Sequence, residues 1–302
     1  MKYYEVQFEI HPLVPDACDL LAALAGDAGF ESFEDSPKGL IGYVPQSLFD
    51  EAVLQEVLSE FPYEGVTVGY TVREAEDRDW NEQWEQEGFE PIIVNNKQRI
   101  VNSDMPSGLV IHDGRHLPDP SLFTNQDSLF TTIEIDAHQA FGTGTHETTQ
   151  MVCATLLEHD LKDLRTLDCG CGTGILSICA LKLGAREAIG YDIDEWSVDN
   201  ARHNAVINLV DQHFKSLLGD ATILNKVEGT FDLVMANINR NILLADMPLF
   251  REKMAHDAHL ILSGFYTTDS PLLIEKAQSL GLQFVSQKSD NDWACLLFSY
   301  SL

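Results

Sequence analysis

The C-terminal part of the 302-residue chain predicts a doubly wound, mostly parallel α/β sheet. Three observations lead to this fold class. Apolar strand-like runs alternate with helix-like segments from Glu147 onward. One run, ending at Asp168, leads directly into a glycine-rich turn, and the next run ends in another acidic residue, Asp192. Because ligands of such sheets bind at the carboxyl ends of the strands, we expect the site at these turns.

The first 74 residues predict a separate small α+β domain. Apolar alternation marks the strands, and apolar faces at helical spacing mark the helices. The resulting order, βαββαβ, is that of the ferredoxin-like fold. The expected elements are a strand at Tyr3–Ile10, a helix at Pro15–Leu24, strands at Phe30–Asp35 and Leu40–Val44, a helix at Ser47–Phe61 and a strand at Val66–Val72.

Residues 75–91 predict a charged linker helix, because Trp80 and Trp84 stand four apart and would share one helix face. Residues 92–302 then form the α/β domain. Its first part holds extended segments at Ile92–Val101 and Phe130–Ile135, and we expect Asn102–Asp127 to be loops or a small subdomain. The later strands are expected at Thr166–Asp168, Ala188–Asp192, Phe231–Ala236, His259–Ser263, Leu282–Gln287 and Trp293–Ser299, and the helices at Ile175–Leu183, Glu195–Asn208, Asn239–Met254 and Ser270–Leu280.

Composition restricts the class of partner. The net charge of −29 disfavours direct tight binding to nucleic acid and would attract a basic partner. The six cysteines, with Cys169 and Cys171 lacking a second pair at zinc spacing, predict reduced thiols and no metal site. No apolar run reaches membrane-spanning length and the N-terminus does not read as a secretory signal, so we expect a cytoplasmic protein with no membrane contact.

The glycine-rich turn is the central motif. Gly170, Gly172 and Gly174 follow a G-x-G-x-G pattern, not the G-x-G-x-x-G of dinucleotide-binding enzymes. Glycines let the backbone approach a ligand closely. The carboxylate of Asp168 suits a cationic amino group better than a phosphate. The turn therefore favours S-adenosylmethionine, although alone it could be an ordinary strand-to-helix turn.

Two further acidic residues follow at strand ends. Asp192 is expected to accept hydrogen bonds from both ribose hydroxyls. Asp194 is the alternative for that role, or else caps the following helix. Asp220, after Gly219, is expected to take the exocyclic amine of adenine, with a plain turn as the alternative.

Asn237 ends a buried apolar strand and would lie beside the methyl donor, where its amide orients an incoming amine. The alternative is an N-cap of the next helix. The small residues from Phe141 through Gly144 to Thr149 predict a flexible lid or a ligand-contacting cap. His146 lies there, but we do not expect a lone loop histidine to be catalytic.

From about residue 77 onward the sequence resembles the bacterial ribosomal protein methyltransferases that act on large-subunit ribosomal protein eleven. The FGTGTH-x-TT segment is far more specific than the glycine turn, which all class I methyltransferases share. The matching segments are AFGTGTHETT (140–149), LDCGCGTGILSICALKLGA (167–185), GYDID (190–194), NARHNAVIN (200–208), MANI (235–238), LSGFY (262–266) and the Asp79-Trp80…Trp84 linker.

The resemblance implies a substrate-recognition domain (1–74), a linker helix (75–91) and a class I catalytic domain (92–302) with a Rossmann-like seven-stranded sheet. It implies methylation of lysine side chains and the N-terminal α-amine of that ribosomal protein. The cofactor contacts fall on Thr149, Gly170, Asp192 and Asn237; Asp168, Gly172, Asp220, Phe141 and Gly144 are added as candidates from the motifs above. The chain departs from the family at Asn239-Arg240-Asn241, where an apolar run and a proline are usual.

Other functions remain open at this stage. A methyltransferase of nucleic acid bases is disfavoured by the net charge and because no aromatic residue follows Asn237 closely to stack a flipped base. A nicotinamide oxidoreductase is disfavoured by the glycine spacing. A methyltransferase of another protein or of a small-molecule amine, and a non-catalytic binding module, are the remaining alternatives. We expect a monomer.

Overall fold

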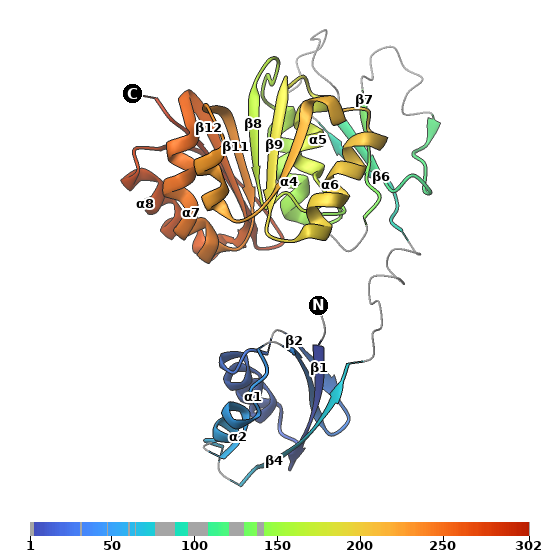
Figure 1. Cartoon of the computed structure of the whole chain (residues 1–302), viewed down its shortest axis with the longest axis vertical. Coiled ribbons are helices and arrows are strands. Elements are labelled where there is room, and N and C mark those ends of the chain that lie inside the picture. Colours follow the sequence, from blue (N-terminus) through green and yellow to red (C-terminus); the bar gives the residue numbers. More distant parts are fainter. Residues whose placement is uncertain are drawn as a thin grey trace. The chain divides into compact units, whose positions relative to one another are not determined.

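The computed structural model describes residues 3–30, 32–46, 48–59, 61–63, 65–75, 88–95, 108–120, 130–137 and 142–301. Internal contacts divide the chain into two compact units, Met1–Trp80 and Asn81–Leu302 (Figure 1). The predicted linker helix, with Trp80 and Trp84, lies mostly outside the described residues, so the three-part division of the chain stays a prediction. Among the described helices, none is long and apolar enough to cross a membrane.

The N-terminal unit has the predicted ferredoxin-like order. Its four strands form an antiparallel sheet in the order β2-β3-β1-β4. Alternate residues of β1, namely Val6, Phe8 and Ile10, are fully buried and face the helices, as expected for a sheet covered on one side. The elements are β1 (Tyr3–His11), α1 (Pro15–Asp27), β2 (Ser32–Ser36), β3 (Gly39–Pro45), α2 (Glu51–Ser59) and β4 (Thr67–Glu74).

The second unit is built on a seven-stranded sheet in the order β10-β9-β8-β11-β12-β14-β13. All neighbouring pairs are parallel except those made by β14, so the predicted mostly parallel doubly wound sheet is confirmed. Its strands are β8 (Arg165–Cys169), β9 (Glu187–Asp192), β10 (Phe214–Leu218), β11 (Phe231–Asn237), β12 (Met254–Tyr266), β13 (Gln283–Asp290) and β14 (Trp293–Ser299).

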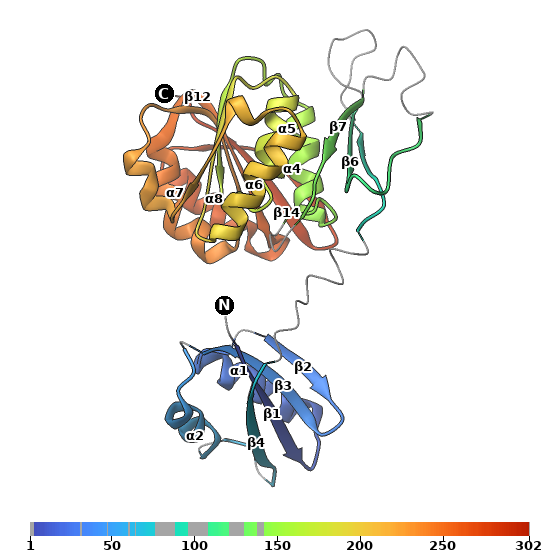
Figure 2. The ribbon, with the colours of Figure 1, turned by 45° about the vertical axis from the view of Figure 1, so that its right-hand side comes forward.

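Helices cover both faces of this sheet (Figure 2). One buried cluster joins α4 and α5 to the side chains of Leu233 and Met235, and the other joins α7 and α8 to Val234 and Ala236. Successive residues of β11 thus face opposite layers, which explains why the strand is apolar without alternation. The helical elements are α4 (Glu147–Leu157), α5 (Ile175–Lys182), α6 (Glu195–Ile207), α7 (Arg240–Lys253) and α8 (Ser270–Ser279), with short 3₁₀ turns η2 (Asp211–His213), η3 (Ala221–Lys226) and η4 (Thr267–Asp269).

A three-stranded sheet of β5 (Ile92–Asn95), β6 (Gly108–His112) and β7 (Phe130–Glu134) packs beside α4 and α5. Strand β6 falls inside the stretch for which the sequence predicted loops or a small subdomain, so the loop prediction is wrong there. The strand is five residues long and buried throughout, and it pairs with two strands distant in sequence. A short apolar run of this kind has no periodicity that identifies it.

Candidate active site

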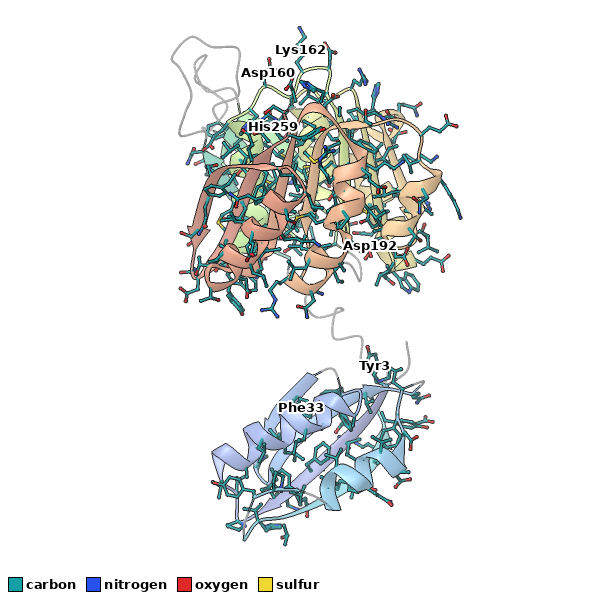
Figure 3. All side chains as sticks on the ribbon, turned by 90° about the vertical axis from the view of Figure 1, so that its left-hand side faces the viewer. Tyr3, Phe33, Asp160, Lys162, Asp192 and His259 are labelled. Atoms are coloured by element: carbon teal, nitrogen blue, oxygen red, sulfur yellow. The ribbon has the colours of Figure 1, made fainter. Side chains whose placement is uncertain are left out.

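The predicted side chains meet where β8, β9 and β11 end. Cys169, the last residue of β8, pairs with Tyr191 on one side and with Ala236 on the other. Asp168, Asp192 and Asn237 therefore lie at the same edge of the sheet, as the parallel order requires. Figure 3 shows Asp192 at this end of the unit.

The glycine-rich turn wraps around the end of β9. Gly170, Gly172 and Gly174 all have left-handed φ values, of 72°, 51° and 79°. The backbone N–H of Gly170 donates to the carbonyl of Tyr191 at 2.9 Å, and that of Gly172 donates to Oδ2 of Asp192 at 2.9 Å. A Cβ atom on Gly170 would stand 2.5 Å from Ile238 Cγ2. Glycine is therefore required at Gly170 by both conformation and space.

Asp168 is a buried carboxylate with one unpartnered oxygen. Its Oδ2 accepts hydrogen bonds from the backbone N–H of Ser177 at 3.1 Å and from the Ser177 hydroxyl at 2.8 Å. Its Oδ1 is buried and has no partner among the described residues. Burial raises the pKa of Asp168 to about 6; Ser177 opposes the rise and the charge of Asp192 adds to it. This carboxylate is placed to receive a cation.

The carboxylate of Asp192 accepts hydrogen bonds from two backbone N–H groups, that of Gly172 at 2.9 Å and that of Asp194 at 3.1 Å. These bonds fix the carboxylate beside the glycine-rich turn. Asp194 itself caps α6, because its Oδ2 accepts from the backbone N–H of Ser197 at 2.9 Å. The capping alternative for Asp194 is thus correct. Asp220 begins η3 and accepts from the Thr222 hydroxyl and backbone N–H, which lower its pKa.

Asn237 lies across the turn, against α4. Its Nδ2 donates to the Thr149 hydroxyl at 3.4 Å, and its Oδ1 is buried with no partner among the described residues. The N-cap of α7 is Asn239, whose Oδ1 accepts from Ile242 N–H at 3.1 Å. The N-cap alternative for Asn237 is therefore wrong, and its amide oxygen is available to a ligand.

The departure at Asn239-Arg240-Asn241 has a structural role. Asn239 caps the helix, Arg240 Nη1 pairs with Asp269 Oδ1 at 2.8 Å, and Arg240 Nη2 donates to Asn241 Oδ1 at 3.1 Å. The pair joins the start of α7 to η4, next to the end of β12.

The loop before α4 packs on the glycine-rich turn. The Thr173 hydroxyl donates to the carbonyl of Gly142 at 2.6 Å. Gly144 has a φ of 98°, and a Cβ atom there would lie 3.1 Å from both Ile111 and Ile175. Phe141, predicted as a cofactor contact, lies outside the described residues. Gly144 thus serves close packing of the loop on α5.

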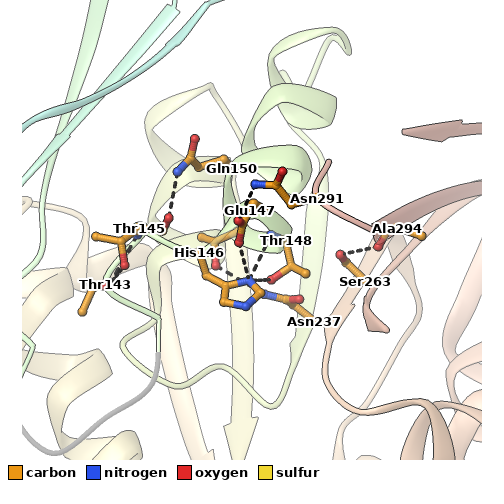
Figure 4. A network of polar contacts seen from close by, with 11 residues as sticks. Thr143, Thr145, His146, Glu147, Thr148, Gln150, Asn237, Ser263, Asn291 and Ala294 are labelled. Carbon is orange, nitrogen blue, oxygen red and sulfur yellow. Dashed lines mark hydrogen bonds and ion pairs between the residues drawn. The ribbon is translucent and has the colours of Figure 1, made fainter. Parts of the chain in front are cut away.

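His146 is the N-cap of α4 (Figure 4). Its Nδ1 accepts the backbone N–H of Thr148 at 3.2 Å, so the neutral ring carries its proton on Nε2. A ring in this tautomer presents a donor, with no free lone pair, to a substrate. The geometry thus gives His146 a capping role at the start of α4.

Comparison with known proteins agrees with this geometry. The family profile described as "Ribosomal protein L11 methyltransferase (PrmA)" matches residues 34–300. Proteins named ribosomal protein L11 methyltransferase from Phocaeicola vulgatus and Bacteroides thetaiotaomicron are 42% identical over 298 residues and 43% identical over 300 residues; each alignment covers 99% of this chain, and 99% and 100% of the relative. The chain belongs to the ribosomal protein L11 methyltransferase family.

A solved structure of the ribosomal protein L11 methylase from Lactobacillus delbrueckii subsp. bulgaricus matches with a TM-score of 0.56 and 26% identity. It covers 70% of this chain and 99% of that one. This membership confirms both the predicted class I methyltransferase fold and S-adenosylmethionine as the methyl donor.

The described residues fit that donor. S-adenosylmethionine carries an ammonium group and amine hydrogens, and the two buried oxygens without partners, Asp168 Oδ1 and Asn237 Oδ1, are acceptors at the strand ends. The Gly170 turn follows β8, which is the neighbour of the strand that carries Asn237. We expect Asp168 to bind the amino-acid end of the donor and Asp192 to bind its ribose. Both assignments remain predictions.

The sequence analysis missed a row of three asparagines, two on α6 and the third, Asn208, at its C-cap. Asn200, Asn204 and Asn208 stand four apart, on one face of the helix. The side chain of Asn204 donates to the carbonyl of Thr173 in the glycine-rich turn at 2.9 Å and accepts from the backbone of Asp136 at 3.0 Å. This amide row joins the turn to the segment after β7. Its signal was the spacing of the asparagines in the segment NARHNAVIN.

A histidine-lined cavity and the cysteine thiols are the other features that could carry chemistry in the described residues. A cavity of about 460 Å³ is lined by His159, His256 and His259 near the amino ends of β11 and β12. Figure 3 shows His259 at the end of the unit opposite Asp192. All six cysteines are free, and burial raises the pKa of Cys169 and Cys171 well above the usual value, which makes them inert thiols.

Proposed function

We propose that this chain transfers methyl groups from S-adenosylmethionine to amines of ribosomal protein L11, the side chains of its lysines and its N-terminal α-amine. The observation that carries the proposal is identity of about 42% along 99% of the chain with proteins named for that activity. The alignment includes the N-terminal unit, which we propose recognises the substrate.

The reaction is a displacement in which an amine lone pair attacks the methyl carbon of the sulfonium; the N–C bond forms as the S–C bond breaks, and S-adenosylhomocysteine leaves as a neutral thioether. A free lysine has a pKa of about 10.4, so the ammonium group must first lose a proton to solvent. Asn237 Oδ1, buried and without a partner, is placed to accept the N–H of an incoming amine and so direct its lone pair. Such alignment contributes up to roughly 7–11 kcal/mol in oriented reactions.

The remaining residues bind and position the donor. Asp168 carries the charge opposite the donor's ammonium group, and Asp192, held by Gly172 N–H, accepts from the ribose hydroxyls. Asp220 lies close to Asp192, because the backbone N–H of the preceding Gly219 donates to the Asp192 carbonyl at 2.8 Å. That position supports contact with adenine.

The partner is a basic protein, and the net charge of −29 supports electrostatic attraction to it. The same charge disfavours direct tight binding to nucleic acid, so we propose that the ribosomal protein, free or on the ribosome, is bound without tight RNA contact. Such a substrate supports a cytoplasmic location. We propose a monomer, which light scattering on the purified chain would test.

The experiment is a methyl-transfer assay on purified L11, whole ribosomes, other ribosomal proteins and small amines, read by mass spectrometry. Methylated lysines and a methylated N-terminus on L11, reduced with Asp192→Ala at limiting S-adenosylmethionine, support the proposal. Transfer to another protein or only to small amines would instead favour the alternatives left open by the sequence. Absence of transfer to any acceptor, with S-adenosylmethionine bound, would reject an enzymatic function for these acceptors.

A further inference from the structure

An aromatic pair stands where β12 ends and β14 begins, near the predicted active site. Tyr266, the last residue of β12, stacks on Trp293, the first residue of β14, with ring centroids 4.3 Å apart and planes inclined by 29°. The His146 ring meets Trp293 edge-on at 4.8 Å. Tyr266 is 50% exposed, so the pair presents aromatic surface to solvent.

Strand register and helix contacts place this pair beside Asn237. Asn237 pairs with Ser263, and Tyr266 lies three residues further along β12, on the order of 10 Å beyond. From the other side, His146 caps the helix on which Thr149 accepts from Asn237. Figure 4 shows His146, Thr148 and Asn237 together at this helix end.

The turn that carries Trp293 is held in place and is acidic. Asn291 and Asp292 have left-handed φ values of 44° and 68°. Asn291 Nδ2 donates to Glu147 Oε1 at 2.9 Å, and the Asp292 carbonyl accepts from Thr267 N–H at 2.7 Å. Asp290 and Asp292 stand in the hairpin turn that leads into Trp293, and Glu147 is bonded to that turn through Asn291, while Arg240 at the start of α7 is paired with Asp269.

We propose that Tyr266 and Trp293 form the entrance site for the substrate's ammonium group, in its unmethylated and its methylated forms. Aromatic faces attract cations within about 6 Å, and they do so for quaternary ammonium groups, which have neither a hydrogen to donate nor a lone pair. The carboxylates add long-range attraction. The aromatic pair would therefore hold a partly methylated lysine side chain beside the predicted active site between methyl transfers. This inference rests on the proposed amine substrate.

The test uses the full chain with S-adenosylhomocysteine present and measures, by calorimetry, binding of the amide of acetylated trimethyl-lysine. That probe cannot hydrogen-bond through its nitrogen, so the aromatic contribution is isolated. Tyr266→Phe keeps the ring, Tyr266→Leu removes it, and Phe284→Leu, at another exposed aromatic on β13, is the matched control.

We expect Tyr266→Leu to weaken probe binding roughly 3- to 30-fold, the range of cation–π energies, with S-adenosylmethionine affinity unchanged. Tyr266→Phe and Phe284→Leu should bind like the wild type. Mass spectrometry of L11 should then show more mono- and dimethylated product with Tyr266→Leu. Equal binding by the Leu and Phe variants, no binding by the wild type, or parallel loss of S-adenosylmethionine affinity would each overturn the proposal. Failure of the proposed function differs: the wild type would bind the probe but leave L11 unmethylated.

Discussion

Two buried aspartates give a paired test of the site, because their pKa values move in opposite directions. Burial raises the pKa of Asp168 to about 6. Burial also acts to raise the pKa of Asp113, but hydrogen bonds from the His116 ring and from the backbone of His116, Arg115 and Phe89 outweigh it and hold that pKa well below its usual range. The same substitution, Asp→Asn, should therefore have opposite effects on stability at the two positions.

For Asp168, the ionised form is disfavoured in the folded protein. Its contribution to stability is present in full below the ordinary pKa of 3.8 and is lost as the pH rises through about 6. That loss is about 3 kcal/mol at neutral pH. Asp168→Asn removes this destabilisation of the folded protein at neutral pH, and it weakens the Ser177 hydrogen bonds by roughly 1 kcal/mol. The net gain of about 2 kcal/mol should raise Tm on the order of 5 °C in the absence of ligand.

Asp113→Asn is the control with the opposite sign. The contribution of Asp113 to stability is present above the ordinary pKa and is lost as the pH falls through the lowered one. The amide would put an NH₂ group against the Phe89 N–H, which now donates to Oδ2 at 3.0 Å. We expect a loss of about 2 kcal/mol or more at neutral pH.

The assays are thermal unfolding without ligand and titration calorimetry with S-adenosylmethionine. Asp168→Asn should bind at least 30-fold more weakly, because truncating one partner of a buried charge pair costs about 2 kcal/mol or more. Wild-type affinity should fall about tenfold per pH unit below pH 6, and the variant should lose that dependence. A less stable Asp168→Asn protein that binds S-adenosylmethionine normally would refute the reasoning.

Four further outcomes are expected. Asn237→Ala should lower kcat by tenfold or more with little change in S-adenosylmethionine Kd; equal losses in both contradict the orienting role. Asp192→Ala should weaken S-adenosylmethionine binding at least tenfold by calorimetry, and unchanged affinity rejects the ribose assignment. Asn204→Ala should cost about 2–4 kcal/mol in denaturant unfolding because it removes the donor to the Thr173 carbonyl and the acceptor of the Asp136 backbone N–H, whereas the exposed Val206→Ala on the same helix should cost far less. Association with L11 should slow steeply with salt in stopped-flow kinetics, and salt-independent rates would exclude electrostatic steering.

The sequence predicted the fold well where a local pattern coincides with the final element. The strands ending at Asp168 and Asp192 and the ferredoxin-like order of the first 74 residues have clear periodicity and turns. It missed β6, whose pairing with β5 and β7 depends on residues distant in the chain. It also did not place β14 between β12 and β13, because strand order is a property of packing.

Within the site, spacing along the chain predicted which residues meet, but not what each one touches. Asp168 and Asn237 were chosen for their positions at strand ends, and the structure adds the unpartnered oxygen on each. The roles of Asn204 and of the Tyr266–Trp293 pair depend on side chains from elements far apart in sequence, such as β12, β14 and α4. No local pattern encodes such contacts.

The glycine-rich turn and the carboxylates beside it lead to one consequence for stability. Asp168 and Asp192 bring two negative charges to one turn, and the charge of Asp192 contributes to the raised pKa of Asp168. The protein without ligand bears that repulsion, and a bound ammonium group relieves it. Stability given up in the free protein thus becomes affinity for the methyl donor. Because a ligand that binds only the folded state stabilises it, S-adenosylmethionine should raise Tm most in the wild type and least in Asp168→Asn.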